Sequence, residues 1–167
     1  MGEKHQTRDS YTFIPIGIIH SPFTEISGMP IQPNGARGIP GTVEIFEEYK
    51  EGLRDINGFS HLFLVYAFHQ CVSFALTVTP FLDTSPHGVF ATRAPKRPNA
   101  IGLSIVRLRE VKETTLSVED VDILDGTPLL DVKPYVPVFD AYPEAASGWL
   151  EQNADGVGLF RSDGRFG

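Results

Sequence analysis

The most chemically suggestive part of the sequence is the run Ala-Thr-Arg-Ala-Pro-Lys-Arg-Pro-Asn at residues 91–99. Its three cations are Arg93, Lys96 and Arg97, and prolines stand on both sides of the Lys-Arg pair. Because proline fixes φ, it reduces the conformational freedom of such a loop. A preorganised guanidinium is planar and donates two parallel hydrogen bonds to a carboxylate or a phosphate. We therefore predict that this loop binds an anion and lies at the centre of an active site.

The charge of the chain is unevenly distributed. The formal net charge is -7, which argues against a general nucleic-acid binder. Residues 91–112 nevertheless contain six basic side chains and a single acidic one, Glu110. This pattern fits a polyanionic substrate that is bound at one place, although solvated charges on strands and loops would give the same pattern.

Three other segments are candidates for ligand contacts. Pro30-Ile31-Gln32 combines stiffened backbone with an amide that could bind a small ligand, and a plain loop is the alternative. Aromatic rings and imidazoles at residues 58–61 and 66–69 could stack on a purine, and core packing is the alternative. The turn at residues 124–128 offers a carboxylate and backbone groups, but a simple hairpin would also explain it.

Several classes of site are excluded. The five histidines are scattered, and Cys71 is the only cysteine, so we expect no metal site and no internal disulfide. No glycine-rich turn of the G-x-G-x-x-G type joins a strand to a helix, which argues against a Rossmann nucleotide site. The absence of an apolar leader or an apolar run of about 20 residues predicts a cytoplasmic protein with no membrane contact.

The spacing of apolar residues predicts the elements that must position these groups. Ile45, Tyr49, Leu53 and Ile56 recur at helical intervals, and Asn57-Gly58 should end that helix. Asp125-Gly126 predicts a turn between two antiparallel strands. Strands are expected at residues 13–19, 42–46, 61–69, 74–79, 88–92, 101–111, 116–124 and 129–132.

These elements predict a mostly-β fold. Strands and helices alternate too little for a parallel sheet, and closure of a barrel removes exposed sheet edges. We therefore expect a single-sheeted antiparallel β-barrel with one or two short helices. Its residues should be 11–145, preceded by a flexible leader at 1–10. A C-terminal tail at 146–167 is expected to flex or to dock on a partner, because little of it can form a core.

Four segments together resemble the TsaA-like family. They are Gly-Phe-Ser-His at 58–61, Tyr-x-Phe-His at 66–69, Gly-Val-Phe-Ala-Thr-Arg-x-Pro-x-Arg-Pro-Asn-x-Ile-Gly-Leu-Ser at 88–104, and Leu-Asp-Gly-Thr-Pro-x-x-Asp-x-Lys-Pro-Tyr at 124–135. The resemblance implies an antiparallel β-barrel that binds S-adenosyl-L-methionine and works as a homodimer. It also implies methylation of N6 of threonylcarbamoyladenosine at position 37, in the anticodon loop of threonine tRNA.

The resemblance also assigns roles to residues. The implied cofactor contacts are Pro30, Ile31, Gln32, Phe68, His69, Arg93, Leu103, Asp125, Gly126, Thr127 and Pro128. Lys96 and Arg97 would meet RNA phosphates. The general base is left open among His69, Tyr66, Asp125, Asp131 and Tyr135.

The chain departs from the family pattern in three ways. Ala94 and Ala100 stand where serine and proline are expected, and nothing corresponds to the extra C-terminal domain of longer bacterial members. The mode of tRNA docking therefore stays open. Three alternatives also stay open: a methyltransferase of the same fold with another substrate, a non-catalytic module that binds S-adenosyl-L-methionine or RNA, and a structural domain whose basic loop contacts a partner.

Overall fold

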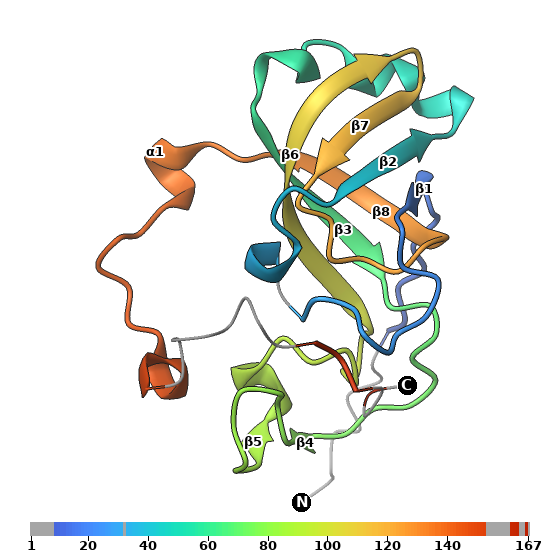
Figure 1. The fold of residues 1–167 in the computed structure, drawn as a ribbon. Coiled ribbons are helices and arrows are strands. Elements are labelled where there is room, and N and C mark those ends of the chain that lie inside the picture. Colours follow the sequence, from blue (N-terminus) through green and yellow to red (C-terminus); the bar gives the residue numbers. More distant parts are fainter. Residues whose placement is uncertain (1–8, 32, 153–160, 164–165, 167) are drawn as a thin grey trace, which may run out of the picture.

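A six-stranded closed barrel forms the body of the protein (Figure 1). The computed structural model describes residues 9–31, 33–152, 161–163 and 166. The strands follow the order β1-β2-β7-β6-β3-β8, and every neighbouring pair is antiparallel. Their bounds are Gly17–His20 for β1, Pro40–Ile45 for β2, His61–Ala67 for β3, Ile101–Lys112 for β6, Thr115–Glu119 for β7 and Thr127–Pro134 for β8. The predicted mostly-β antiparallel barrel is confirmed.

Alternating side chains fill the interior of the barrel. In β3, Leu62, Leu64 and Tyr66 are buried, whereas the residues between them lie on the outer face and are only partly covered. The sequence of this strand is apolar on both faces, but only its inward face is fully buried, because a barrel strand has an outer face as well. The inward residues meet a core of Ile19, Val43, Val106, Leu116 and Leu129.

A small second unit lies below the barrel in Figure 1. Here β4 (Thr77–Val78) pairs with β5 (His87–Gly88), and the short 3-10 helix η4 (Val89–Ala91) leads into the basic loop. The longer strands predicted at 74–79 and 88–92 are wrong. Prolines next to β4 and β5 lack the N–H needed to extend a ladder, so pairing stops after two residues.

The predicted helix at residues 45–56 does not form as an α-helix. It is divided into two 3-10 helices, η2 (Glu47–Leu53) and η3 (Ile56–Gly58). Asp55 separates them with a φ of 66°, a left-handed conformation that an α-helix cannot contain. The other helices are also short: η1 (Pro33–Ala36), α1 (Pro137–Asp140) and η5 (Gly148–Gln152). No helix in the described part of the chain is long and apolar enough to cross a bilayer.

The Asp125-Gly126 turn is not part of a hairpin, contrary to prediction. β7 and β8 are not neighbours, because β8 pairs with β1 and β3 instead. The chain between them crosses the end of the barrel, and its Val121 and Ile123 side chains are buried in the core. The apolar residues that suggested a longer strand therefore close the barrel end.

Two described residues of the predicted C-terminal tail, Ser162 and Phe166, contact the rest of the chain, so part of this segment does contribute to a core. Ser162 exchanges two backbone hydrogen bonds with the early loop: Gly28 N–H donates to Ser162 O at 2.7 Å, and Ser162 N–H donates to Met29 O at 2.8 Å. Phe166 is only 8% exposed and packs with Val78 and Val89. The predicted flexible leader lies mostly outside the described residues, and the predicted domain boundaries stay predictions.

Candidate active site

One end of the barrel gathers most of the predicted site residues. Ala67 at the end of β3 pairs with Ile101 at the start of β6, and Ile19 near the end of β1 pairs with Thr127 at the start of β8. These strand ends therefore lie at the same rim, which we call the loop end. The backbone N–H of Phe68 donates to Ala100 O at 2.8 Å and ties the chain after β3 to the basic loop.

The aromatic and apolar side chains of the predicted set differ in how they lie at this end. The Phe68 ring meets the ring of Tyr66 edge-on, at 5.4 Å between centroids. His69 follows it and is exposed. Leu103 is 53% exposed on the outer face of β6, since the inward positions beside it are Gly102 and Ser104. Phe68 and His69 thus stand at the rim, whereas Leu103 faces outward.

The cations of the basic loop have different surroundings. Arg97 Nη1 lies within 3.0 Å of Val89 O and 2.8 Å of Thr92 O, and 3.4 Å from Ala94 O. It therefore holds the loop in shape from within. Arg93 is exposed and makes no hydrogen bond or ion pair to any described residue, yet its charge acts on Tyr66 and Asp122. Arg93 is therefore available to an anion at the loop end.

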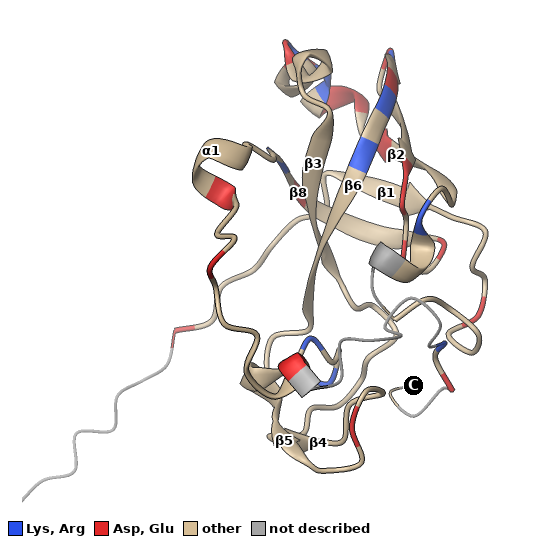
Figure 2. Cartoon of the chain, turned by 60° about the vertical axis from the view of Figure 1, so that its left-hand side comes forward, with Lys and Arg blue, Asp and Glu red and all other residues tan. Residues whose placement is uncertain are grey.

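The six basic residues of 91–112 do not form one patch. Figure 2 shows cations on the upper part of β6, well away from those in the loop beside β4 and β5. On β6, Arg109 and Arg107 face Glu119 and Asp120 of the neighbouring strand and its extension. Lys96 and Arg93 remain as loop cations with no ion pair to a described residue. The predicted contacts of Lys96 and Arg97 with RNA stay predictions.

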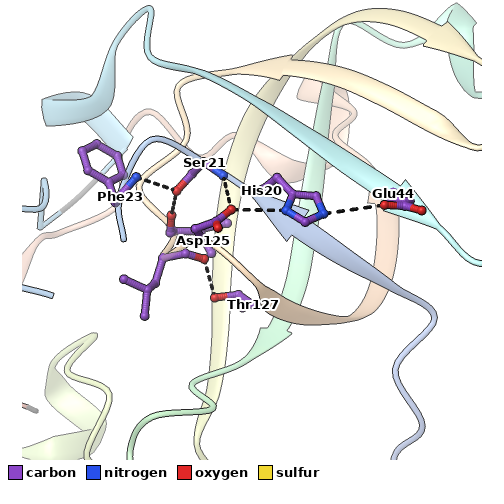
Figure 3. Close-up of polar contacts among 8 residues, drawn as sticks. His20, Ser21, Phe23, Glu44, Asp125 and Thr127 are labelled. Carbon is purple, nitrogen blue, oxygen red and sulfur yellow. Dashed lines mark hydrogen bonds and ion pairs between the residues drawn. The ribbon is translucent and has the colours of Figure 1, made fainter. Parts of the chain in front are cut away.

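The turn after the crossover presents a carboxylate whose position is fixed (Figure 3). Asp125 Oδ1 accepts the backbone N–H of Ser21 at 3.1 Å and lies 3.2 Å from His20 Nδ1. The other side of the His20 ring lies 3.6 Å from Glu44. Asp125 Oδ2 has no partner among the described residues, so it can accept hydrogen bonds from a ligand.

The remaining turn residues and the early loop are placed as follows. Gly126 is exposed with a φ of 74°, a conformation suited to glycine. The Thr127 hydroxyl is buried and donates to Leu124 O at 2.7 Å, so this side chain closes the turn. Pro30 is buried and bridges to Arg161, and its loop runs alongside the loop end in Figure 1. Ile31 is half-buried, and Gln32 lies outside the described residues.

Two candidate bases are not brought into this group. Asp131 forms an ion pair with Lys133 at 2.7 Å and lines a separate cavity of about 370 Å³ beside η2, which none of the other predicted residues lines. Tyr135 lies at the opposite end of β3, where its N–H donates to His61 O. In the described part of the chain there is also no cluster of side chains that could hold a metal ion.

Sequence reasoning missed a buried polar chain at the loop end. The Tyr66 hydroxyl lies 3.1 Å from Ser104 Oγ, which donates to Asp122 Oδ1 at 2.7 Å. Burial raises the pKa of Asp122 to about 6, although Ser104 and Arg93 favour its ionised form. Burial also raises the pKa of Tyr66, which makes it a poor base near neutral pH. The signal in the sequence was a carboxylate directly between the apolar residues Val121 and Ile123.

Known proteins match both the sequence and this fold. The family model of the tRNA-methyltransferase O N-terminal domain matches residues 18–141. A probable S-adenosyl-L-methionine-binding protein from Pyrococcus abyssi is 57% identical over 152 residues, covering 91% of this chain and 83% of that protein. The tRNA (adenine(37)-N6)-methyltransferase of Escherichia coli is 35% identical over 85% of this chain and 65% of its own length.

Solved structures agree with the family model. A crystal structure of TrmO superimposes with a TM-score of 0.72 at 42% identity, over 84% of this chain and 64% of the other. TrmO from Pseudomonas aeruginosa gives a TM-score of 0.71 at 39% identity, over 84% and 63%. The chain therefore spans less than two thirds of these TrmO chains. The resemblance found in the motifs at 58–61, 66–69, 88–104 and 124–135 is confirmed, and the chain belongs to the tRNA-methyltransferase O N-terminal domain family.

Proposed function

We propose that this chain is an S-adenosyl-L-methionine-dependent tRNA methyltransferase that methylates N6 of threonylcarbamoyladenosine at position 37 of threonine tRNA. The observation that carries the proposal is the guanidinium of Arg93, which has no partner among the described residues and acts on Tyr66 and Asp122. It belongs to the end of the barrel where Phe68 and the Asp125 turn also lie. Relatives named as methyltransferases of adenine 37 in Escherichia coli and mouse support the reaction and the class of substrate.

The groups at the loop end fit the parts of S-adenosyl-L-methionine. Arg93 would hold the carboxylate of its methionine moiety, or the carboxylate of the substrate's threonyl group. Phe68 offers a ring that could stack on adenine, and Asp125 Oδ2 could accept from ribose hydroxyls. When bound, the cofactor supplies an activated methyl group. The residues of this chain bind and orient it, and positioning alone can contribute about 7–11 kcal/mol to such a reaction.

The RNA would approach the basic loop from outside. Lys96 would meet phosphates, and its side chain has no ion pair to a described residue. Bases in an anticodon loop can be splayed out of the stack, so position 37 could enter the loop end. The protein is negatively charged overall and carries a few cations in the basic loop, so we expect its contact with RNA to be confined to this loop.

The decisive experiment is mass spectrometry of nucleosides from threonine tRNA incubated with the full chain and the cofactor. The proposal expects N6-methylated threonylcarbamoyladenosine with modified tRNA, and no product with tRNA that lacks the threonylcarbamoyl group. Arg93→Ala should lose both cofactor binding and transfer. Arg54→Ala is the matched control, because Arg54 is exposed directly after η2 and pairs, among the described residues, with Glu51. Methylation of both tRNAs would instead identify a same-fold enzyme with another substrate.

A second candidate function is a module that binds S-adenosyl-L-methionine without methyl transfer. It is favoured by the names of relatives from Pyrococcus abyssi and Archaeoglobus fulgidus, which state binding alone. Calorimetric binding of the cofactor, with no transfer to any tRNA in a total cellular pool, would select this function.

We further propose that the protein works as a homodimer through the outer face of β3 and β6. Three apolar residues of β6 lie on this face, Ile101, Leu103 and Ile105, and each is more than a third exposed. They pair with Ala67, Val65 and Phe63 of β3, so the face is continuously apolar. Contiguous apolar patches on a protein surface often mark a contact with another protein, and a second copy of this chain would cover this one. The predicted cytoplasmic location stays a prediction.

A further inference from the structure

A directional hydrogen-bonded chain at the loop end has no role in the binding contacts described above. Ser104 Oγ donates its single proton to Asp122 Oδ1, so toward Tyr66 it can only accept, and the Tyr66 hydroxyl must donate. Each hydroxyl thus points its proton toward the carboxylate. Ser104 is 2% exposed and Tyr66 is 5% exposed, which fixes both donors, while Asp122 is only partly buried.

At the end of this chain, one oxygen of the Asp122 carboxylate receives no side-chain hydrogen bond from a described residue, although the backbone N–H of Asp122 also acts on the carboxylate. Ser104 bonds Oδ1, and no described side chain donates to Asp122 Oδ2. The charged or titratable groups that face Asp122 are Tyr66 from β3 and Arg93 from the basic loop. Arg93 stays cationic and Tyr66 stays a neutral hydroxyl through the neutral range, so Asp122 is the group of this cluster that can change protonation there.

Building on the proposed function, we propose that Asp122 is the proton acceptor of methyl transfer, taking the proton of the target N6 on Oδ2 while Ser104 and Tyr66 hold Oδ1. The other candidates are less suited. His69 is exposed with no described partner to orient it, and Asp131 is paired with Lys133. The Oδ2 atom of Asp125 is assigned above to the ribose hydroxyls, while its Oδ1 is shared by Ser21 and His20.

The chemistry balances on this assignment. The carbamoyl group delocalises the lone pair of N6, so removal of its proton makes the nitrogen a better nucleophile. As the N–CH3 bond forms, the S–CH3 bond breaks and its electron pair stays on sulfur. The N6 proton passes to Asp122. A sulfonium and a carboxylate are thus converted into a neutral thioether and a carboxylic acid, with no further reactant.

The test compares Asp122→Asn, Ser104→Ala and Asp55→Asn with the wild type. Asparagine preserves the shape of Asp122 and can still accept from Ser104. Asp55 is exposed in a left-handed conformation that asparagine tolerates, so this control makes the same chemical change away from the site. Single-turnover transfer at saturating cofactor and tRNA is measured from pH 5 to 9, and cofactor affinity is measured by calorimetry.

The expected results separate proton acceptance from binding. The wild-type rate should rise with pH up to about 6, the pKa of Asp122, and then level off. Asp122→Asn should lose this rise and about 10²–10⁴-fold in rate, with cofactor affinity changed by less than about threefold. Ser104→Ala should move the rise to higher pH. The Ser104 hydroxyl stabilises the ionised carboxyl of Asp122, so its removal raises the pKa of this carboxyl. Asp55→Asn should behave like the wild type.

A readout without catalysis completes the test. In the ligand-free protein, the ¹³C resonance of the Asp122 carboxyl should titrate near pH 6 and at higher pH in Ser104→Ala. A midpoint below pH 4 overturns the proposal, as does an Asp122→Asn rate within about threefold of wild type. So does an Asp122→Asn variant that loses cofactor affinity but keeps the saturated rate. If the wild type methylates no tRNA, the proposed function fails. If the wild type is active and Asp122→Asn transfers the methyl group at the same rate, only the assignment of Asp122 as proton acceptor fails.

Discussion

Gly102 lies directly opposite Tyr66 across the β3–β6 pairing, and the Tyr66 ring occupies the space where a Cβ at Gly102 would stand. That Cβ would come within 2.2 Å of Tyr66 Cε2. The ring is also held by Phe68 at its edge and by Ser104 at its hydroxyl, so it cannot swing away. A glycine at position 102 is therefore required to leave room for the ring of Tyr66, the first donor of the hydrogen-bonded chain.

Gly102→Ala should destabilise the protein by about 1–3 kcal/mol, because an added methyl group must displace a buried ring. Urea unfolding followed by circular dichroism measures this change. Gly52→Ala is the matched control, since a Cβ there meets nothing within 4 Å. Equal stability of the two variants would show that the Tyr66 ring can move.

Asp122 should make the stability of the protein fall as the pH rises through the acidic range. Folding raises its pKa from 3.8 to about 6, so the folded protein keeps this proton longer than the unfolded chain. The stabilising effect of the bound proton is present below about pH 4 and is lost between about pH 4 and 6. It amounts to about 3 kcal/mol.

The Asp122→Asn variant has no ionisable group at position 122. Its stability relative to wild type should therefore increase by about 3 kcal/mol between about pH 4 and 6, and stay constant above that range. Urea unfolding at pH 4, 5, 6, 7 and 8 gives the difference at each pH. A difference independent of pH would show that Asp122 titrates alike in both states.

The barrel could be predicted because its strands carry local signals. Residues 101–111 form a long segment whose first half is apolar, which predicts a strand, and β6 occupies Ile101–Lys112. Strand order carries no such signal. Val121 and Ile123 look like a strand in the sequence, but they close the barrel end, and this depends on β8 pairing with β1 and β3. The local sequence pattern cannot distinguish apolar residues that form a strand from apolar residues in a loop that closes the barrel.

The site was predictable only in part for a similar reason. The sequence predicted ligand contacts for both Arg93 and Arg97, of cofactor and of RNA respectively. It gave no sign that the carbonyls of η4 and the following loop surround Arg97. Asp122 was missed because its partners, Ser104 and Tyr66, come from other strands through the β3–β6 register. Such groupings exist only after the barrel has closed.

Arg97→Ala should destabilise the basic loop, whereas Arg93→Ala should leave stability within about 0.5 kcal/mol of wild type. Removal of the Arg97 guanidinium takes this donor away from the carbonyls of Thr92 and Ala94, at a cost of about 1–3 kcal/mol. The carbonyl of Val89 keeps the backbone N–H and the hydroxyl of Thr92 as donors. Arg93 has no described partner to leave behind. Urea unfolding and amide exchange of residues 89–97 compare the two. A stability loss in Arg93→Ala as large as in Arg97→Ala would contradict this difference.

Phe166→Ala should loosen the unit that contains β4 and β5. Phe166 packs edge-on against Phe81 at 5.1 Å and covers Val78 and Val89. Loss of a buried phenylalanine ring typically costs several kcal/mol, and here the cost should be local, about 2–3 kcal/mol. Amide exchange should accelerate at β4 and η4 and stay unchanged in β3. Phe139→Ala, at a ring that is 63% exposed, is the control. If the amide of Val89 exchanged at the same rate in Phe166→Ala as in the wild type, Phe166 would not pack on Val89 in solution.

The proposed dimer makes the outer face of β3 and β6 sensitive to a single charge. Ile105→Asp places a carboxylate between apolar neighbours on this face, where a partner would have to desolvate it. The position lies on the outside of the barrel, so the isolated fold should tolerate the change. Sedimentation velocity is expected to show a dimer for wild type and a monomer for Ile105→Asp, with unaltered circular dichroism. Val72→Asp, at a side chain that is 95% exposed, should remain dimeric. A wild-type monomer at high protein concentration, or a dimeric Ile105→Asp, would mean that this face does not form the contact.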